Sequence, residues 1–414
     1  MKSVLIAAKD LKIGGIEKSL IELSNFLEEN GYIVTLALEN REGVLKNQLN
    51  NKIKIIKYKP NTCKIAILRK TINLFKKINF LLKYINKFDI SISYTTYLKS
   101  SSFVARVASK NSILWCHADY LSLFNNDKNK MEDFFEDIFY YKFKKIVFVS
   151  KIGKENFLKV FPEQQNVYFC NNLIDSKKIY EMANEKINLK YNQEITTFLN
   201  VGRHDEKQKK LSRIIKSSVI LKKQKYKFRV IFVGSGSDTI KYKKMVEKYQ
   251  LEKNIIFVGE KENPYPYYKI SNCVILSSDY EGYPVVFLES YILNKPIITT
   301  KISDYEDIKN KRGIVTEKDT KSIYNAMKLF IKDGYTIKDN FDATKYNFEI
   351  KNKLKEILKN GWIFFDFKLK YYKVKNERNV IKYEEKQISI GCKNFSCSYN
   401  MLNSFCRNIC TKDE

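Results

Sequence analysis

The feature that most constrains the fold is a short apolar run that leads through a turn directly into a helical pattern. The run Cys273–Ser278 indicates a buried strand, and the segment Asp279–Ser290 that follows it reads DYEGYPVVFLES. Gly282 and Pro284 favour a turn into a helix, because glycine permits unusual backbone angles and proline suits a first helical position. The stretch therefore predicts a strand, a tight turn and a helix in immediate succession.

Two carboxylates and two free amides give this stretch a chemical character. Glu281 lies at the exit of the predicted strand and Glu289 lies within the helix. The amides of Val285 and Val286 have no partner inside the helix and lie at the positive end of its dipole, which suits a phosphate. A carboxylate deeper in the helix can accept two hydrogen bonds, as a ribose diol offers. The segment could hold a nucleoside diphosphate and its ribose together; alternatively, both glutamates only cap and solvate a helix.

The same alternation of apolar runs and helical patterns occurs along most of the chain. Val4–Ala8 predicts a strand, Ile16–Glu29 a helix, and Ile33–Leu38 the next strand, which together form a βαβ unit. A second series opens at Thr197–Val201, and 414 residues suffice for two domains or more. Further strands are predicted at Asp89–Tyr94, Ser112–Trp115, Lys145–Ser150, Phe228–Val233, Ile255–Val258, Pro296–Thr300 and Gly313–Thr316, and helices at Pro264–Ile270, Ser322–Lys332 and Ile350–Lys359.

The spacing of the two glutamates resembles a family signature. The frame E-G-Y-P-x-x-x-L-E after an apolar strand is similar to that of retaining glycosyltransferases of the GT4 type (glycosyl transferases group 1). The resemblance covers residues 1–360 and is strongest from Phe198 to Thr300. It implies the GT-B fold, an α/β architecture of two Rossmann-like domains whose parallel sheets face each other across a cleft.

The resemblance also divides the chain into domains. It implies an acceptor-side Rossmann-like domain at 1–175, a nucleotide-sugar donor domain at 176–345, and a helix at 346–360 that crosses back to the first domain. The exit from the first domain, Asn171–Asp175, resembles an N-x-I-D pattern. Residues 361–414 are a tail outside the resemblance, and the sequence does not decide its role.

A basic segment directly after Thr197–Val201 resembles the family's G-R-x-x-x-E-K pattern, whose arginine and lysine hold the donor's phosphates. Arg203 matches the arginine cleanly, but the loop is one residue shorter than the commoner form. The E-K context assigns the lysine's role to Lys207 and leaves Lys209 as an alternative. Without the resemblance, this segment would be a solvated basic loop.

One of the two histidines, His117, follows the predicted strand Ser112–Trp115. Open α/β sheets place their ligands at the carboxyl ends of strands. The W-x-H-x-D context resembles the position whose histidine contacts the donor sugar in GT4-type enzymes. The alternative is a histidine that is structural or merely exposed.

The resemblance therefore implies a set of site residues. Glu17 could face the acceptor or could only favour a helix N-terminus. The resemblance assigns catalysis to His117, Arg203, Lys207 and Glu281. It assigns donor binding to Gly14, Gly15, Arg203, Lys207, Gly234, Gly259, Glu281, Gly282, Tyr283, Pro284, Val285, Val286 and Glu289.

No D-x-D triplet occurs in the chain, which argues against a diphosphate held by a metal ion and suits positive side chains in that role. We therefore expect no metal site. We also expect no cofactor beyond the donor substrate, for which a UDP-sugar is the favoured form.

The chain is strongly basic, with 75 Lys and Arg against 46 Asp and Glu and a formal charge of +29. Such a charge predicts an anionic partner: nucleic acid, anionic lipid or a phosphorylated substrate. No apolar run approaches the roughly eighteen residues that span a bilayer. The N-terminal run Val4–Ala8 is too short for a signal peptide.

Basic residues concentrate between Lys52 and Lys87, which contains eleven Lys or Arg and no acidic residue. Two interpretations are open and compatible: a helix that packs its apolar side on the domain with its lysines solvated, or a basic surface that rests on anionic lipid. The apolar residues at helical spacing are Ile72, Phe75, Ile78, Leu82 and Ile85.

Cysteines fall into two groups. Cys63, Cys116, Cys170 and Cys273 are scattered, which suits reduced thiols in a cytosol. The other four follow an aromatic and basic stretch in the tail, and their spacing does not match a zinc ribbon, so we expect unpaired thiols. These are Cys392, Cys397, Cys406 and Cys410.

The resemblance implies a retaining glycosyltransferase that moves a sugar from a nucleotide diphosphate to a saccharide acceptor, lipid-linked in the favoured form. The expected setting is the synthesis of a surface polysaccharide (capsule, exopolysaccharide or lipopolysaccharide) at the cytoplasmic face of the membrane, with peripheral attachment. The alternatives are a non-hydrolysing nucleotide-sugar epimerase on the same fold, a transferase-like scaffold without catalysis, and a basic nucleic-acid-binding protein. No recognition motif supports the last of these, and nucleic acid is not an expected partner.

Overall fold

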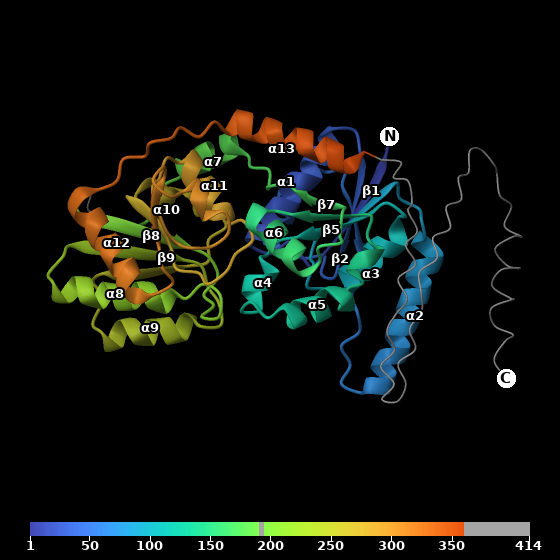
Figure 1. Ribbon diagram of the computed structural model, residues 1–414, viewed down its shortest axis with the longest axis horizontal. Helices are drawn as coiled ribbons and strands as arrows, with labels where there is room; N and C mark the ends of the chain where they lie inside the picture. The colour runs from blue at the N-terminus through green and yellow to red at the C-terminus, as the bar shows by residue number, and fades with distance from the viewer. Residues whose placement is uncertain (190–193, 360–414) are drawn as a thin grey trace, which may run out of the picture. The chain divides into compact units, whose positions relative to one another are not determined.

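The computed structural model describes residues 1–189 and 194–359, which form two parallel β-sheets with helices packed on them (Figure 1). The first sheet has seven strands in the order β3-β2-β1-β4-β5-β6-β7, and the second has six in the order β10-β9-β8-β11-β12-β13. Two parallel Rossmann-like sheets are what the sequence predicts, so the α/β fold class is confirmed.

The strands lie close to the predicted apolar runs. Those of the first sheet are β1 (Ser3–Ala8), β2 (Ile33–Leu38), β3 (Lys54–Lys57), β4 (Ile90–Ser93), β5 (Ser112–Cys116), β6 (Lys145–Phe148) and β7 (Val167–Phe169). Those of the second are β8 (Thr196–Val201), β9 (Phe228–Val233), β10 (Ile255–Gly259), β11 (Cys273–Leu276), β12 (Ile297–Thr300) and β13 (Gly313–Thr316). The central strands are buried on both faces, and β11 and β12 are buried throughout. Parallel strands covered on both faces have continuous apolar sequences, which is why the sequence locates them.

Helices follow most strands. The first half contains α1 (Gly15–Glu29), η1 (Val44–Gln48), α2 (Ala66–Tyr84), α3 (Lys99–Ala108), α4 (Tyr120–Leu123), α5 (Lys128–Asp137), η2 (Tyr140–Lys142), α6 (Lys151–Val160) and α7 (Ser176–Ala183). The second contains α8 (Leu211–Lys223), α9 (Thr239–Lys248), α10 (Tyr265–Lys269), α11 (Val285–Ile292), η3 (Tyr305–Asp307), α12 (Thr320–Asp333) and α13 (Ala343–Leu358).

Two helices join the halves of the chain. Helix α7 leaves the first sheet, and the hydroxyl of Tyr180 on it donates to the carbonyl of Ile292 at 2.7 Å. Helix α13 comes back: the amide of Asn347 bonds the carbonyl of Ile174 at 2.7 Å, and the ammonium of Lys145 bonds the carbonyl of Lys359 at 3.0 Å. The last described helix therefore packs on the half that carries the first sheet.

Helix α2 corrects one expectation. The interpretation that its apolar side packs on the domain is wrong for most of the predicted stripe, because Phe75, Ile78, Leu82 and Ile85 are exposed. The buried residue of α2 is Phe80, which lies outside that stripe and packs against Tyr58 with ring centroids 4.9 Å apart. Helical spacing located the helix, but it did not identify the face that packs.

Within the described part of the chain, no helix is long and apolar enough to cross a membrane. The four cysteines described there, Cys63, Cys116, Cys170 and Cys273, are all free thiols. The predicted tail 361–414, with its other four cysteines, lies outside the described residues.

Candidate functional site

Two helix N-termini, one from each half of the chain, meet at the proposed site. Helix α1 begins at Gly15 and helix α11 begins at Val285. A Cβ atom on Gly15 would lie 3.6 Å from Cγ2 of Val285. The amino ends of both helices, with the positive ends of their dipoles, therefore come together, which is an arrangement that favours anions.

Gly282 allows the exit of β11 to lie against the exit of β5. A Cβ atom on Gly282 would lie 2.0 Å from the carbonyl oxygen of His117, which is closer than any side chain can approach. Beside it, the amide of Asp119 donates to the carbonyl of Glu281 at 3.1 Å. Glycine is needed here for close backbone contact, so this predicted site residue has a structural role between the two halves.

Three donors from its own half hold the carboxylate of Glu281. Lys209 Nζ lies 2.6 Å from Oε1, Ser278 Oγ lies 2.8 Å from Oε1, and Gln208 Nε2 lies 3.1 Å from Oε2. Glu281 is 7 % exposed, so these bonds are largely shielded from water. Three donors fix the orientation of this carboxylate, as a group that positions a substrate requires.

The basic loop after β8 brings Lys209, rather than Lys207, to this carboxylate. Arg203 is exposed and its Nη2 donates to Oε1 of Gln208 at 3.1 Å, so Gln208 links Arg203 to Glu281. The Lys207 side chain is exposed, and the backbone amide of this residue donates to Oδ1 of Asp205 at 2.8 Å. Sequence analysis gave Gln208 no role, and only the unusual loop length signalled that the assignment of the lysine was open.

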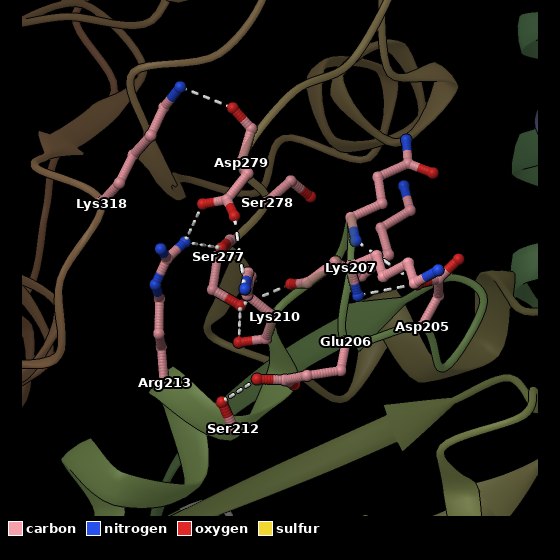
Figure 2. A network of polar contacts seen from close by, with 12 residues as sticks. Asp205, Glu206, Lys207, Lys210, Ser212, Arg213, Ser277, Ser278, Asp279 and Lys318 are labelled. Carbon is pink, nitrogen blue, oxygen red and sulfur yellow. Dashed lines mark hydrogen bonds and ion pairs between the residues drawn. The ribbon is translucent and has the colours of Figure 1, made fainter. Parts of the chain in front are cut away.

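A polar network anchors this loop to the exit of β11 (Figure 2). Asp279 accepts a hydrogen bond from Nη1 of Arg213 at 2.5 Å and lies 3.5 Å from Nζ of Lys210. The hydroxyl of Ser277 lies 2.9 Å from the carbonyls of Lys209 and Lys210. Lys210 itself has a left-handed backbone with φ of 52°. These contacts fix the backbone on which Lys209 stands.

Glu289 is held across the two halves. Its Oε1 lies 2.7 Å from Nζ of Lys18 on α1, and its Oε2 accepts a hydrogen bond from the hydroxyl of Tyr268 at 2.6 Å. Burial alone would lower the pKa of Lys18, but the charge of Glu289 outweighs it and raises that pKa above its ordinary value. Burial and the charge of Glu289 raise the pKa of Tyr268. Neither Lys18 nor Tyr268 is among the site residues predicted from the sequence.

His117 presents an unsatisfied atom beside this site. Its ring packs against Tyr94 with centroids 4.3 Å apart, and burial lowers its pKa to about 3. The buried Nε2 atom has no hydrogen-bond partner among the described residues. A buried polar atom without a partner is costly, so a bound hydroxyl at this position would be favoured.

The remaining predicted site residues differ in burial and backbone conformation. Burial raises the pKa of Glu17, whose Oε2 lies 2.1 Å from where a Cβ atom on Gly14 would stand. Gly234 and Gly259 have positive φ values, 142° and 76°, at the ends of adjacent strands. The Tyr283 side chain is buried against Phe287 with ring centroids 6.0 Å apart, so a contact with a ligand would fall to its backbone.

Other contacts also connect the halves. The carboxylate of Asp304, which follows β12, accepts hydrogen bonds from the amides of Lys151 and Ile152 at 2.9 and 3.0 Å, in the first turn of α6. Burial raises the pKa of Asp304. Over residues 1–189 and 194–359, no group of three or more His, Cys, Asp or Glu side chains is arranged to hold a metal ion.

Curated relatives are glycosyltransferases. An uncharacterized glycosyltransferase of Methanocaldococcus jannaschii is 27% identical over 170 residues, which span 39% of this chain and 41% of that relative. The capsular polysaccharide biosynthesis glycosyltransferase CapH of Staphylococcus aureus is 23% identical over 303 residues, with 71% and 80% covered. The amylovoran biosynthesis glycosyltransferase AmsD of Erwinia amylovora is 24% identical over 336 residues, with 79% and 89% covered.

Solved structures share the fold. Anabaena Alr3699/HepE in complex with UDP and glucose superposes with a TM-score of 0.67 at 16% identity and covers 86% of this chain and 100% of its own. A mutant of S. aureus TarM in complex with Fondaparinux, alpha-GlcNAc-glycerol and UDP has a TM-score of 0.67 at 13% identity, with 87% and 100% covered.

Two family descriptions match adjacent parts of the chain. Residues 13–178 match Glycosyltransferase Family 4, and residues 182–348 match Glycosyl transferases group 1. The first match contains strands β2–β7 of the first sheet, and the second match contains all the strands of the second sheet. The chain therefore carries a Glycosyltransferase Family 4 domain followed by a Glycosyl transferases group 1 domain on a GT-B fold.

Proposed function

We propose that this protein transfers a sugar, with retention of anomeric configuration, from a nucleoside diphosphate to a saccharide acceptor in the synthesis of a surface polysaccharide. The observation that carries the proposal is the meeting of the α1 and α11 N-termini at Gly15 and Val285. A diphosphate at that point would face free amides from both halves. The relatives CapH and AmsD support the polysaccharide setting, since their names place them in capsule and amylovoran synthesis.

Each site residue takes a defined part in this proposal. The two helix starts and Arg203, with Lys209 as the nearer of the two candidate lysines, stabilise the diphosphate as it leaves. Glu289 accepts hydrogen bonds from the ribose diol, and Glu281 accepts them from sugar hydroxyls. His117, neutral at physiological pH because burial lowers its pKa to about 3, bonds the sugar through Nε2. UDP in the complexes of HepE and TarM favours a UDP-sugar as donor.

The chemistry breaks the bond between the anomeric carbon and the diphosphate oxygen and forms one to the acceptor oxygen. The acceptor's hydroxyl proton leaves with the departing diphosphate or passes to solvent. Negative charge grows on the diphosphate, and preorganised cations and amides stabilise it. Basic side chains and helix starts take the part that a metal ion plays elsewhere, so we propose a metal-independent reaction. Glu281, held by three donors, acts by orientation and not as a free nucleophile.

A panel of nucleotide sugars tests the activity. Purified protein should release nucleoside diphosphate from one donor only when a saccharide acceptor is present, and NMR of the product should show an unchanged anomeric configuration. At donor concentrations below KM, the Glu289→Gln and Arg203→Ala variants should both lose transfer while remaining folded, and Glu289→Gln should do so through weaker donor binding. Conversion of the nucleotide sugar without any acceptor would favour an epimerase, and full turnover by either variant would count against the assigned site.

We also propose that α2 rests on the anionic inner face of a membrane, which suits a lipid-linked acceptor. Helix α2 exposes apolar and basic side chains together: Ile67, Phe75 and Leu82 are 80, 67 and 72% exposed. Lysines on such a surface contribute about 1 kcal/mol each next to anionic lipid, and a buried Phe or Leu contributes about 1.5–3 kcal/mol. The exposed apolar residues of α2 are Ile67, Leu68, Leu74, Phe75, Ile78, Leu81 and Leu82, and Ile85 follows directly after the helix.

Flotation with liposomes tests this attachment. The wild type should float with vesicles that contain anionic lipid and stay behind with neutral ones. A Phe75→Ser, Leu82→Ser double variant should lose flotation. The control Ile240→Ser removes a 70% exposed apolar residue from α9 and should float normally. Equal recovery of the wild type with both kinds of vesicle would remove the proposal.

A further inference from the structure

Lys18 contacts the carboxylate that the proposed function assigns to the ribose. Its Nζ lies 2.7 Å from Oε1 of Glu289 and 3.3 Å from the hydroxyl of Tyr265, whose ring it also faces at 4.9 Å. The Lys18 side chain is 20% exposed and that of Glu289 is 2% exposed. Lys18 therefore reaches from the first half of the chain into the second.

The contacts of Glu289 leave a defined set of acceptor positions. An ionised carboxylate has about four lone-pair positions, two on each oxygen. Lys18 uses one position on Oε1, and Tyr268 uses one on Oε2 at 2.6 Å. One position on each oxygen is left. Two adjacent acceptor positions match the two neighbouring hydroxyls of a ribose, which can donate one hydrogen bond to each oxygen.

The Glu289 carboxylate is buried, so protein groups take the place of water around it. A carboxyl group that is removed from water favours its protonated form unless a cation lies next to it. A protonated carboxyl would itself donate a hydrogen bond and would lose an acceptor position. Lys18 supplies the cation at 2.7 Å. The other titratable groups near Glu289 are two tyrosines of α10: Tyr268 donates to Glu289, and Tyr265 accepts a hydrogen bond from Lys18.

We propose that Lys18 is a positioning residue of the nucleoside site: its contact with Oε1 orients the carboxylate of Glu289 so that one lone pair of each oxygen receives the ribose diol. The inference rests on the proposed function, because it takes Glu289 as the ribose-binding group. It adds that a nucleoside site carried by the second half of the chain is completed by a side chain of the first half.

Discrimination between ribose and deoxyribose tests this role. Dissociation constants for UDP and 2′-deoxy-UDP are measured by calorimetry for the wild type and the variants Lys18→Met, Lys18→Arg and Lys178→Met. Lys178 is the matched control, because it lines the same small cavity as Lys18 but bonds Gln48, at 2.8 Å. If UDP does not bind, the corresponding GDP and ADP pairs are used.

The wild type should bind UDP about tenfold or more tightly than 2′-deoxy-UDP, since a hydrogen bond to a charged acceptor is lost. In Lys18→Met this ratio should fall to about one to two, while Lys18→Arg should restore most of it and Lys178→Met should keep it. The ratio is insensitive to general loosening of the structure, because both ligands meet the same protein.

The outcomes separate the two proposals. If Lys18→Met prefers UDP over 2′-deoxy-UDP by the same ratio as the wild type, the role of Lys18 is overturned and the proposed function stands. This holds even if the variant binds both ligands more weakly. A wild type that binds no nucleoside diphosphate, or binds the deoxy form as tightly, overturns the ribose assignment of Glu289, and the inference about Lys18 falls with it. Thermal unfolding of Lys18→Met confirms that the variant is folded.

Discussion

The two glutamates of the E-G-Y-P-x-x-x-L-E frame are held in different ways. Glu281 takes its three donors, Lys209, Gln208 and Ser278, from its own half of the chain. Glu289 takes one donor, Tyr268, from its own half and one, Lys18, from the other. Both carboxylates are buried, and each accepts a hydrogen bond from a lysine. They differ in whether their geometry depends on the contact between the halves.

This difference assigns the two ends of the site different sensitivities. A carboxylate whose hydrogen-bond donors all lie in its own half keeps its orientation when the halves shift. This suits a group that contacts the reacting sugar. A carboxylate shared between the halves senses their contact, which suits a group that recognises the nucleoside. The Glu281 end should therefore control turnover, and the Glu289 end should control donor affinity.

Removing the charge at the Glu281 end should have the largest effect. Glu281→Gln keeps the shape of the side chain but leaves Lys209 without its counter-ion. We expect kcat to fall by about 10²–10³-fold with a small change in KM, as when a preorganised polar group is lost from a reacting centre. Steady-state kinetics measure this. A change confined to KM would place Glu281 with Glu289 and break the comparison.

Lys209→Ala should come next, with kcat/KM reduced by about 10²-fold, because its ammonium lies 2.6 Å from Glu281 beside the proposed phosphate site. Lys207→Ala is the matched control on the same loop, and its exposed side chain predicts a change of about twofold or less. Parallel kinetics of the two variants decide which lysine acts on the donor. If Lys207→Ala lost more activity than Lys209→Ala, Lys207 would be the phosphate-binding lysine, as its E-K context predicts.

Gly282→Ala should weaken the contact between the halves at the Glu281 end. Its added Cβ would lie 2.0 Å from the carbonyl oxygen of His117, so backbone must move, at a cost of about 1–3 kcal/mol. We expect lower thermal stability together with a fall of about tenfold in kcat/KM. Calorimetry and kinetics measure both. Because the donors to Glu281 stay in place, the orientation of its carboxylate should survive. A complete loss of activity would show that the Glu281 end of the site also depends on the contact between the halves.

Acidification should have the smallest effect, through His117. Its pKa is about 3 in the folded protein, against about 6.5 in an unfolded chain, so the unfolded state alone takes up a proton between these values. Stability from this group is therefore complete above about pH 6.5 and is lost as pH falls towards 3, by about 1–2 kcal/mol at pH 5. Urea unfolding at pH 7 and pH 5 should show a smaller loss in His117→Gln. An equal loss in both proteins would mean that other groups dominate.

The sequence predicted most of the fold because the physical signal is local. Parallel strands buried on both faces give unbroken apolar runs, and the Gly282–Pro284 turn marks the start of α11. Helix α2 shows the limit: its spacing predicts a helix, but the choice of Phe80 as the buried residue depends on Tyr58 and Phe103, which the periodicity does not contain.

The parts of the site that the sequence did not reveal are long-range contacts. Lys18 and Glu289 are 271 positions apart, and Gln208 and Glu281 are 73 apart, so no local pattern could join them. The lysine of the basic loop was left open for a different reason. The E-K context favours Lys207, and a loop one residue shorter than the commoner form leaves Lys209 possible. The contact of Lys209 with Glu281 at 2.6 Å appears only in the structure.

The return of α13 has a mechanical consequence. The chain passes between its halves once at α7 and again before α13, whose Asn347 is bonded to Ile174 where the first passage begins. Two chain crossings whose ends lie together should act as a hinge. They would allow one half to rotate relative to the other and would restrict translation and separation of the halves. A single proteolytic cut in either passage would leave the halves joined by the other.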